Sequence, residues 1–162
     1  MLAVCALSAS TRALGQSQTQ YGIRENESRL GTNIKLYAAG PVRYPINKRY
    51  SEFTAEERAS FNEYYEAMAE SDEPPFPKEG MHEMLSYLTK AQAKLLVTGP
   101  LHLVAAVDSV GKVQSVRSVG SPGKSMTSFA TQLLLLTAFK PALCKGVACA
   151  MEFPLYIEFK VR

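Results

Sequence analysis

The sequence has few of the residues that build metal sites. Its 162 residues include two histidines, three cysteines and no tryptophan. A zinc site would need both histidines and two of the cysteines, and the spacing of these residues matches no recognised zinc-binding motif. We therefore predict no metal and no other cofactor. The residues concerned are His82, His102, Cys144 and Cys149.

Long apolar runs and concentrated charge are also missing. The longest apolar runs, 101–107 and 133–136, are far shorter than the roughly 18 residues that a transmembrane helix needs. An inner-membrane anchor is expected only if residues that precede Met1 are missing. The net charge of +3 is spread along the chain, whereas nucleic-acid binding requires clustered Lys and Arg. No nucleic-acid partner is predicted.

Motifs typical of enzymes are absent or incomplete. The GKS at 123–125 ends like a phosphate-binding P-loop, but Ser118 stands where that motif requires glycine and Pro122 has no amide hydrogen. No nucleophile motif is present, and no carboxylates are spaced for acid–base work. Asp72 and Glu73 lie beside prolines and are expected only to solvate a loop. The chain is therefore predicted not to be an enzyme, and no small-molecule substrate is evident.

The first fifteen residues, MLAVCALSASTRALG, look like the apolar core of a secretory signal. Ala13 and Gly15 provide the small side chains that cleavage requires. Residues 1–15 are therefore predicted to be a signal peptide. No Lys or Arg precedes the apolar run, which indicates either a weak signal or a truncated one. A disordered or partly buried N-terminus is the alternative.

Removal of this leader would take Cys5 away and leave two cysteines. An even number of cysteines in an exported protein favours a disulfide. Gly146 allows the chain reversal that a bond across so short a loop requires. We predict that Cys144 and Cys149 are bonded to each other in an oxidising compartment. The bond would fix where the last strand begins.

The segment before the second half of the chain divides into two parts. Residues 16–50 are polar and are predicted to be flexible or extended. Residues 51–75 are predicted to form a helical extension that ends in a proline-rich loop. Thr54 and Glu57 have the spacing of a capping box, which predicts a helix over about 55–70.

Helical and strand periods alternate in the second half of the chain. In the last strand, apolar side chains occupy every second position, so one face is expected to pack on a core. Pro154 lacks an amide hydrogen, which indicates an edge strand or a bulge. The expected elements are a helix over 80–96, strands over 101–107 and about 112–119, a helix with a buried face from Met126 to Thr137, and a long strand from Cys149 onward.

In this order of elements, residues 76–162 resemble the C-terminal domain of the TonB family of energy transducers. The resemblance implies an α+β fold of two layers, in which helices cover one face of a three-stranded antiparallel sheet. The matching segments are Phe76-Pro77 before the first helix, the hairpin VAAVDSVGKVQSVRSVGS, the helix end TAFKPA, Gly146 in a turn, and the last strand MEFPLYIEFKV.

The same resemblance implies a function. In that family the domain lies in the periplasm and binds a short segment of an outer-membrane receptor by strand addition, which passes energy to transport. The expected partners are therefore outer-membrane receptors or other envelope proteins, and the expected binding edge is the last strand. Residues 33–75 are expected to pack on the domain or to guard that edge. The edge residues are Glu152, Phe153, Pro154, Leu155, Tyr156, Ile157 and Glu158.

A second hypothesis has no transducer role. In it, the chain is a stand-alone periplasmic scaffold that associates with itself through the same edge and forms a homodimer.

Overall fold

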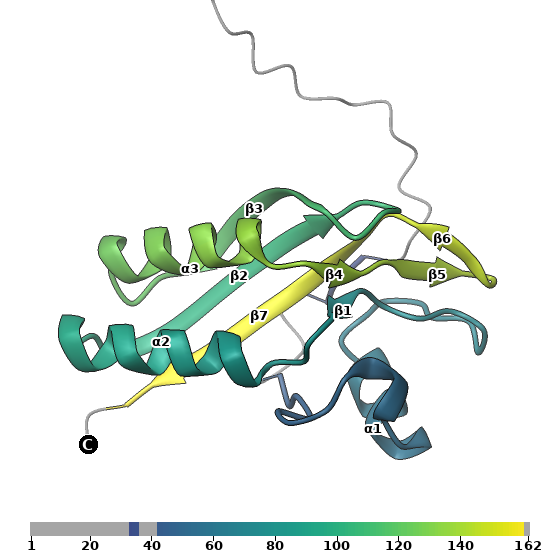
Figure 1. Ribbon diagram of the computed structural model, residues 1–162, viewed down its shortest axis with the longest axis horizontal. Helices are drawn as coiled ribbons and strands as arrows, with labels where there is room; N and C mark the ends of the chain where they lie inside the picture. The colour runs from purple at the N-terminus through teal and green to yellow at the C-terminus, as the bar shows by residue number, and fades with distance from the viewer. Residues whose placement is uncertain (1–32, 36–41, 161–162) are drawn as a thin grey trace, which may run out of the picture.

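The computed structural model describes residues 33–35 and 42–160 (Figure 1). The predicted signal peptide, 1–15, lies outside these residues, as does most of the 16–50 segment. In chain order the elements are η1 (Tyr50–Glu52), α1 (Ala55–Asn62), β1 (Phe76–Pro77), α2 (His82–Leu95), β2 (Gly99–Val107), β3 (Val113–Gly120), α3 (Lys124–Leu136), β4 (Phe139–Lys140), β5 (Ala142–Cys144), β6 (Val147–Cys149) and β7 (Met151–Phe159).

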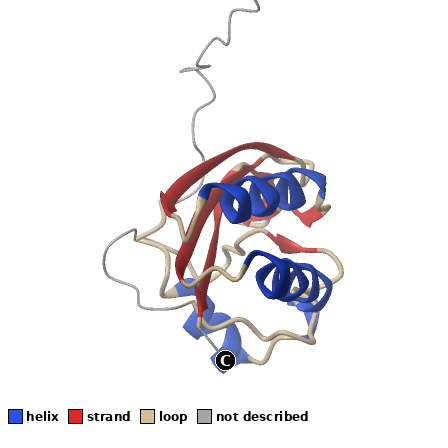
Figure 2. Ribbon diagram, turned by 90° about the vertical axis from the view of Figure 1, so that its left-hand side faces the viewer, coloured by secondary structure: helices blue, strands red, loops and turns tan. Residues whose placement is uncertain are grey.

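The described residues form an α+β fold around a three-stranded antiparallel sheet. The strand order is β3–β2–β7, so β2 is central and the other two strands are edges. Helices α2 and α3 lie side by side against one face of this sheet (Figures 1 and 2). The predicted α+β class, antiparallel sheet and edge position of the last strand are therefore confirmed.

Successive side chains of β2 and β7 point to opposite faces of the sheet, which explains why the helices cover only one face. In β7 the side chains of Met151, Phe153 and Leu155 are buried, as the period-two pattern predicts. Pro154 is also buried, although it belongs to the opposite face. The second face of β7 is therefore not simply exposed to solvent.

From here on, all described residues before β1 (33–35 and 42–75) are called the extension, which is a longer segment than the predicted 51–75. The extension shares its core with the sheet and helices. Phe61 of α1 is fully buried and its ring contacts Phe76 of β1 and Phe153 of β7, with centroids 5.6 and 6.4 Å apart. Among the described residues, nine aromatic rings form one connected cluster, and six of these rings belong to the extension. The rings are Tyr44, Tyr50, Phe53, Phe61, Tyr64, Tyr65, Phe76, Phe139 and Phe153.

Helix α1 begins as predicted but ends early. The Thr54 hydroxyl accepts from the Glu57 amide at 3.2 Å and the Glu57 carboxylate accepts from the Thr54 amide at 2.8 Å, so the capping box is present. The prediction of a helix to about residue 70 is wrong, because α1 ends at Asn62. Beyond that point the backbone of Tyr65 pairs with Ile34 in an isolated bridge, and this pairing replaces further helical turns.

Glycine is required where the β2–β3 turn meets β4. Gly111 has φ +85°, and a Cβ atom there would lie 2.1 Å from the Phe139 carbonyl oxygen. The Phe139 amide donates to the Gly111 carbonyl at 3.1 Å, which holds the turn against β4. Any larger residue would force the two backbones apart.

None of the helices within residues 33–35 and 42–160 is long and apolar enough to cross a membrane.

Candidate functional site

The candidate site is the outer edge of β7, the side that faces away from β2. The Tyr156 amide donates to the hydroxyl oxygen of Tyr44 at 3.0 Å, so it does not point toward β2. Backbone groups of alternate residues in an antiparallel strand point to opposite sides. The carbonyls of Glu152, Pro154 and Glu158 and the amides of Glu152 and Glu158 therefore also face outward.

This alternation explains how a proline fits inside a strand. An amide hydrogen at position 154 would point outward, so its absence removes no hydrogen bond from the β2–β7 ladder. The pairing between β2 and β7 continues without a register shift from Gly99–Phe159 to Val107–Met151. Pro154 therefore marks an edge strand, not a bulge.

Two tyrosine side chains from the extension bond to the outward edge. The Tyr44 hydroxyl donates to the Pro154 carbonyl at 2.6 Å while it accepts from the Tyr156 amide. The Tyr65 hydroxyl donates to the Glu152 carbonyl at 2.9 Å. A neighbouring strand would bond to these same groups. The two hydroxyls therefore occupy the middle of the edge in place of a strand.

The hydroxyls are held in place by aromatic packing. The Tyr44 ring lies 6.1 Å from the rings of both Phe61 and Phe153, and the Tyr65 ring lies 6.1 Å from Phe61. Burial raises the pKa of Tyr44 and of Tyr65 well above the usual value, so both hydroxyls keep their protons even at alkaline pH values where an exposed tyrosine loses its own. Protonated hydroxyls can donate to the carbonyls of β7.

The far end of the edge is more open. The outward amide and carbonyl of Glu158 make no hydrogen bond with any residue of the described part. Beyond them the side-chain amide of Gln92, on α2, donates to the Lys160 carbonyl at 3.0 Å. An incoming chain could therefore reach Glu158 first.

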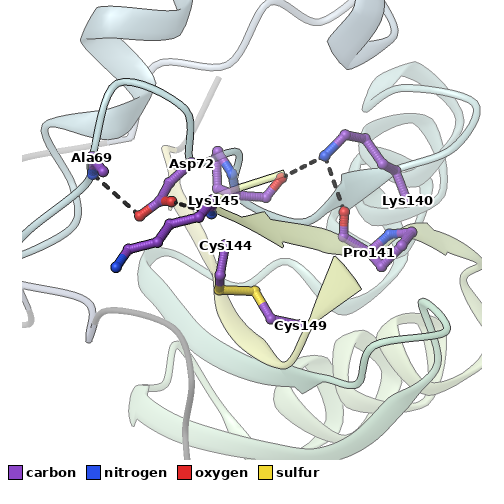
Figure 3. Close-up of a disulfide and its surroundings, with 8 residues drawn as sticks. Ala69, Asp72, Lys140, Pro141, Cys144, Lys145 and Cys149 are labelled. Atoms are coloured by element: carbon purple, nitrogen blue, oxygen red, sulfur yellow. Dashed lines mark hydrogen bonds between the residues drawn. A yellow bond between two sulfur atoms is a disulfide. The ribbon is translucent and has the colours of Figure 1, made fainter. Parts of the chain in front are cut away.

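A disulfide-bonded hairpin stands directly before β7 (Figure 3). The structure joins Cys144 of β5 to Cys149 of β6, the pairing that the sequence predicts, with Cα atoms 5.9 Å apart. The turn between them has positive φ at both Lys145 and Gly146, which is typical of a two-residue hairpin turn. A disulfide that closes so short a loop contributes about 2 kcal/mol in the chain-entropy model.

Two acidic residues of the extension bind this hairpin, which the sequence analysis did not foresee. Asp72 accepts from the amides of Lys145 at 2.7 Å and of Ala69 at 3.1 Å (Figure 3). Glu73 exchanges two backbone hydrogen bonds of 2.8 Å with Leu143. The prediction that Asp72 and Glu73 only solvate a loop is therefore wrong. No local signal in the sequence could have revealed partners about 70 residues away.

His102 is used in packing, whereas His82 is exposed. His102, on β2, lies opposite Tyr156 of β7 with ring centroids 5.6 Å apart, and burial lowers its pKa. The His82 ring nitrogen Nδ1 lies 3.0 Å from the side-chain oxygen of Asn47. Among the described residues, no three His, Cys, Asp or Glu side chains are grouped as a metal ion would require.

No protein-family model, curated protein or solved structure matches the chain.

Proposed function

We propose that this chain is an exported protein-binding domain of the bacterial envelope that captures an extended segment of its partner by strand addition at β7. The role would correspond to that of the TonB-family C-terminal domains which the sequence resembles. Outer-membrane receptors are the partners that this resemblance favours.

The observation that carries the proposal is the way in which the β7 edge is satisfied. Within the described part of the chain, the outward groups in the middle of this edge bond to the side-chain hydroxyls of Tyr44 and Tyr65, and not to a strand. Side-chain contacts of this kind can be exchanged for main-chain hydrogen bonds with an incoming peptide. The open groups of Glu158 give that peptide a place to begin. The disulfide before β7 supports the proposal because it fixes the register that a partner would meet.

In this proposal the extension competes with the partner for the same atoms. Replacing Tyr44 with phenylalanine removes a hydroxyl that makes two hydrogen bonds, each with a net value of about 1 kcal/mol. The partner would no longer have to displace these bonds. We expect Tyr44→Phe to tighten partner binding roughly five- to thirtyfold.

The experiment begins with capture of binding proteins from outer-membrane extract on the wild-type protein. The captured segment is then made as a synthetic peptide, and its affinity is measured with three variants. Tyr44→Phe should bind more tightly, and Glu158→Pro should lose binding because it removes an outward amide without breaking the ladder. Tyr87→Phe removes a hydroxyl on exposed α2, which bonds Glu83, and should change nothing.

The proposal fails if Tyr44→Phe and Tyr87→Phe have equal affinities, or if Glu158→Pro binds the peptide as well as the wild type does.

A further inference from the structure

A hollow of about 240 Å³ lies between the extension and the sheet-bearing part of the chain. One wall comes from α1, from η1 and from Arg49 before it, and the other comes from β4, from β1 and from Lys78 after it. Of the residues that the structure describes, four cationic side chains and one carboxylate line the hollow. The charged lining residues are Arg49, Arg58, Lys78, Lys140 and Glu73.

Ion pairs do not neutralise this hollow. Arg49 pairs with Glu79, which stands next to the lining residues. Glu73 is shared between Lys140 at 3.0 Å and Arg58 at 3.7 Å. Four cations thus face two carboxylates, and an excess of two positive charges remains.

Lys140 supplies charge at a fixed position. Its ammonium donates to the carbonyls of Pro74 at 3.2 Å and Pro141 at 3.0 Å, and it lies 3.0 Å from Glu73 (Figure 3 shows the contact with Pro141). All three of its N–H groups are therefore engaged. Burial lowers the pKa of Lys140, which means that this environment penalises its positive charge. A bound anion would relieve that penalty.

Arg58 supplies hydrogen-bond donors that are not in use. Its guanidinium carbon lies 5.1 Å from the centre of the Tyr50 ring, and Lys140 lies 4.6 Å from the centre of the same ring. Its 3.7 Å distance to Glu73 is too long for a hydrogen bond. No other hydrogen bond of the Arg58 side chain occurs within the described part of the chain. Tyr50 thus orients a guanidinium whose planar set of donors matches carboxylate or phosphate oxygens.

We propose that this hollow binds an oxyanion, a carboxylate or a phosphate group, with Arg58 as the hydrogen-bond donor and Lys140 as the fixed charge. The binding does not depend on strand addition at β7. Because Arg58 belongs to the extension and Lys140 to β4, the anion also ties these two segments together.

The test is a titration of the full chain with inorganic phosphate and, separately, with acetate at constant ionic strength. The backbone amide NMR signals of Ser51 and Lys78, which line the hollow, are followed in each, so that the wild type and every variant are measured by the same signals. We expect a saturable shift with at least one of the two anions, and the anion that binds more tightly identifies the chemical class. Arg58→Gln should weaken binding at least tenfold. Arg58→Lys keeps the charge but loses the planar donors, so it should give an intermediate affinity.

Arg43→Gln is the matched control, because it removes the same charge from an exposed arginine that does not line the hollow. It should bind the anion as the wild type does. A shift that does not saturate with either anion would overturn the proposal. So would equal weakening by Arg43→Gln and Arg58→Gln, or an Arg58→Lys variant that binds no better than Arg58→Gln.

Discussion

The two edges of the three-stranded sheet are protected in different ways. At β7 the protection comes from Tyr44 and Tyr65, which precede the residues that they bond by 87 to 112 positions. At β3 the protection lies in the strand itself. Its pairing with β2 skips Val119 between Ser118 and Gly120, and skips Gln114 between Val113 and Ser115. These two skipped residues are β-bulges, which bend an edge and interrupt its row of hydrogen-bonding groups.

The two edges differ in how permanent their protection is. A bulge is formed by the backbone of β3 itself and is present whenever the strand is folded. The tyrosine hydroxyls remain on β7 only while the extension is packed against the core. This difference supports the proposed function, in which β7 opens to a partner while the bulges keep β3 closed to strands.

The largest expected effect comes from removing the aromatic centre that holds the tyrosines. Phe61 is fully buried and contacts both Tyr44 and Tyr65. Phe61→Ala should lower the free energy of unfolding by about 3–5 kcal/mol, because it removes buried area and leaves a cavity. Denaturant unfolding measures this loss.

Hydrogen exchange in the same variant distinguishes the β7 edge from the β3 edge. The Tyr156 amide should exchange faster relative to the amides of β3, because its acceptor is the Tyr44 hydroxyl. Phe129→Ala is the control, since Phe129 lies exposed on α3 and should change stability by no more than about 0.5 kcal/mol. Equal losses of stability in the two variants would contradict the central role of Phe61.

A smaller effect is expected from alkaline pH. Burial raises the pKa of Tyr44 and of Tyr65, and raises that of Tyr50 to about 12. In the unfolded chain these groups lose their protons near pH 10, so above that pH the unfolded state binds fewer protons than the folded state. Their stabilising contribution is complete below about pH 10 and is lost as the pH rises further.

Unfolding measured at several alkaline pH values should therefore show a stability that falls with pH. Tyr44→Phe should make the fall of the unfolding free energy with pH less steep by up to about 1.4 kcal/mol per pH unit, which is the value for one proton. Tyr87, which is exposed, provides the control: Tyr87→Phe should leave most of the slope in place. If Tyr44→Phe keeps the full slope, the Tyr44 hydroxyl is not held as the geometry indicates.

Sequence patterns were informative where the signal is local. The capping box at Thr54, the alternation of β7 and the short cysteine loop each depend on residues a few positions apart, and each describes the structure well. Protection of the β7 edge by residues 33–75 was one of the expectations, but the residues that provide it were not predicted. A tyrosine at position 44 looks like an ordinary aromatic residue in a polar segment. Its hydrogen bonds to Pro154 and Tyr156 depend on how distant segments pack, and no spacing in a single sequence encodes that.

The same limit applies to β3 and to the end of α1. The bulge at Val119 leaves no mark in the sequence, because an extra residue changes the pairing register and not the composition. Helix α1 was predicted too long because the residues before and after Asn62 have similar intrinsic helix propensities. The bridge from Tyr65 to Ile34 decides where the helix stops.

Deleting Val119 should have the smallest effect on the stability of the fold. It tests most directly whether β3 and β7 are protected in different ways. The side chain of Val119 is 39% exposed, and its backbone is the extra residue of a bulge. Without it, Ser115 to Gly120 could pair with β2 in a single register. The outer side of β3 would then present a regular row of unpaired groups, which is a template for another strand.

We expect the deletion variant to associate with itself at concentrations where the wild type does not, as measured by sedimentation velocity. Val119→Ala keeps the bulge and should behave like the wild type. Adding Val116→Pro should reverse the association, because the alternation of pairs places the Val116 amide on the outer side of β3. Adding Glu158→Pro should not reverse it, because Glu158 lies on the other edge of the sheet. If Glu158→Pro abolishes association and Val116→Pro does not, β7 is the self-associating edge, and the bulges of β3 are not what keeps the chains apart.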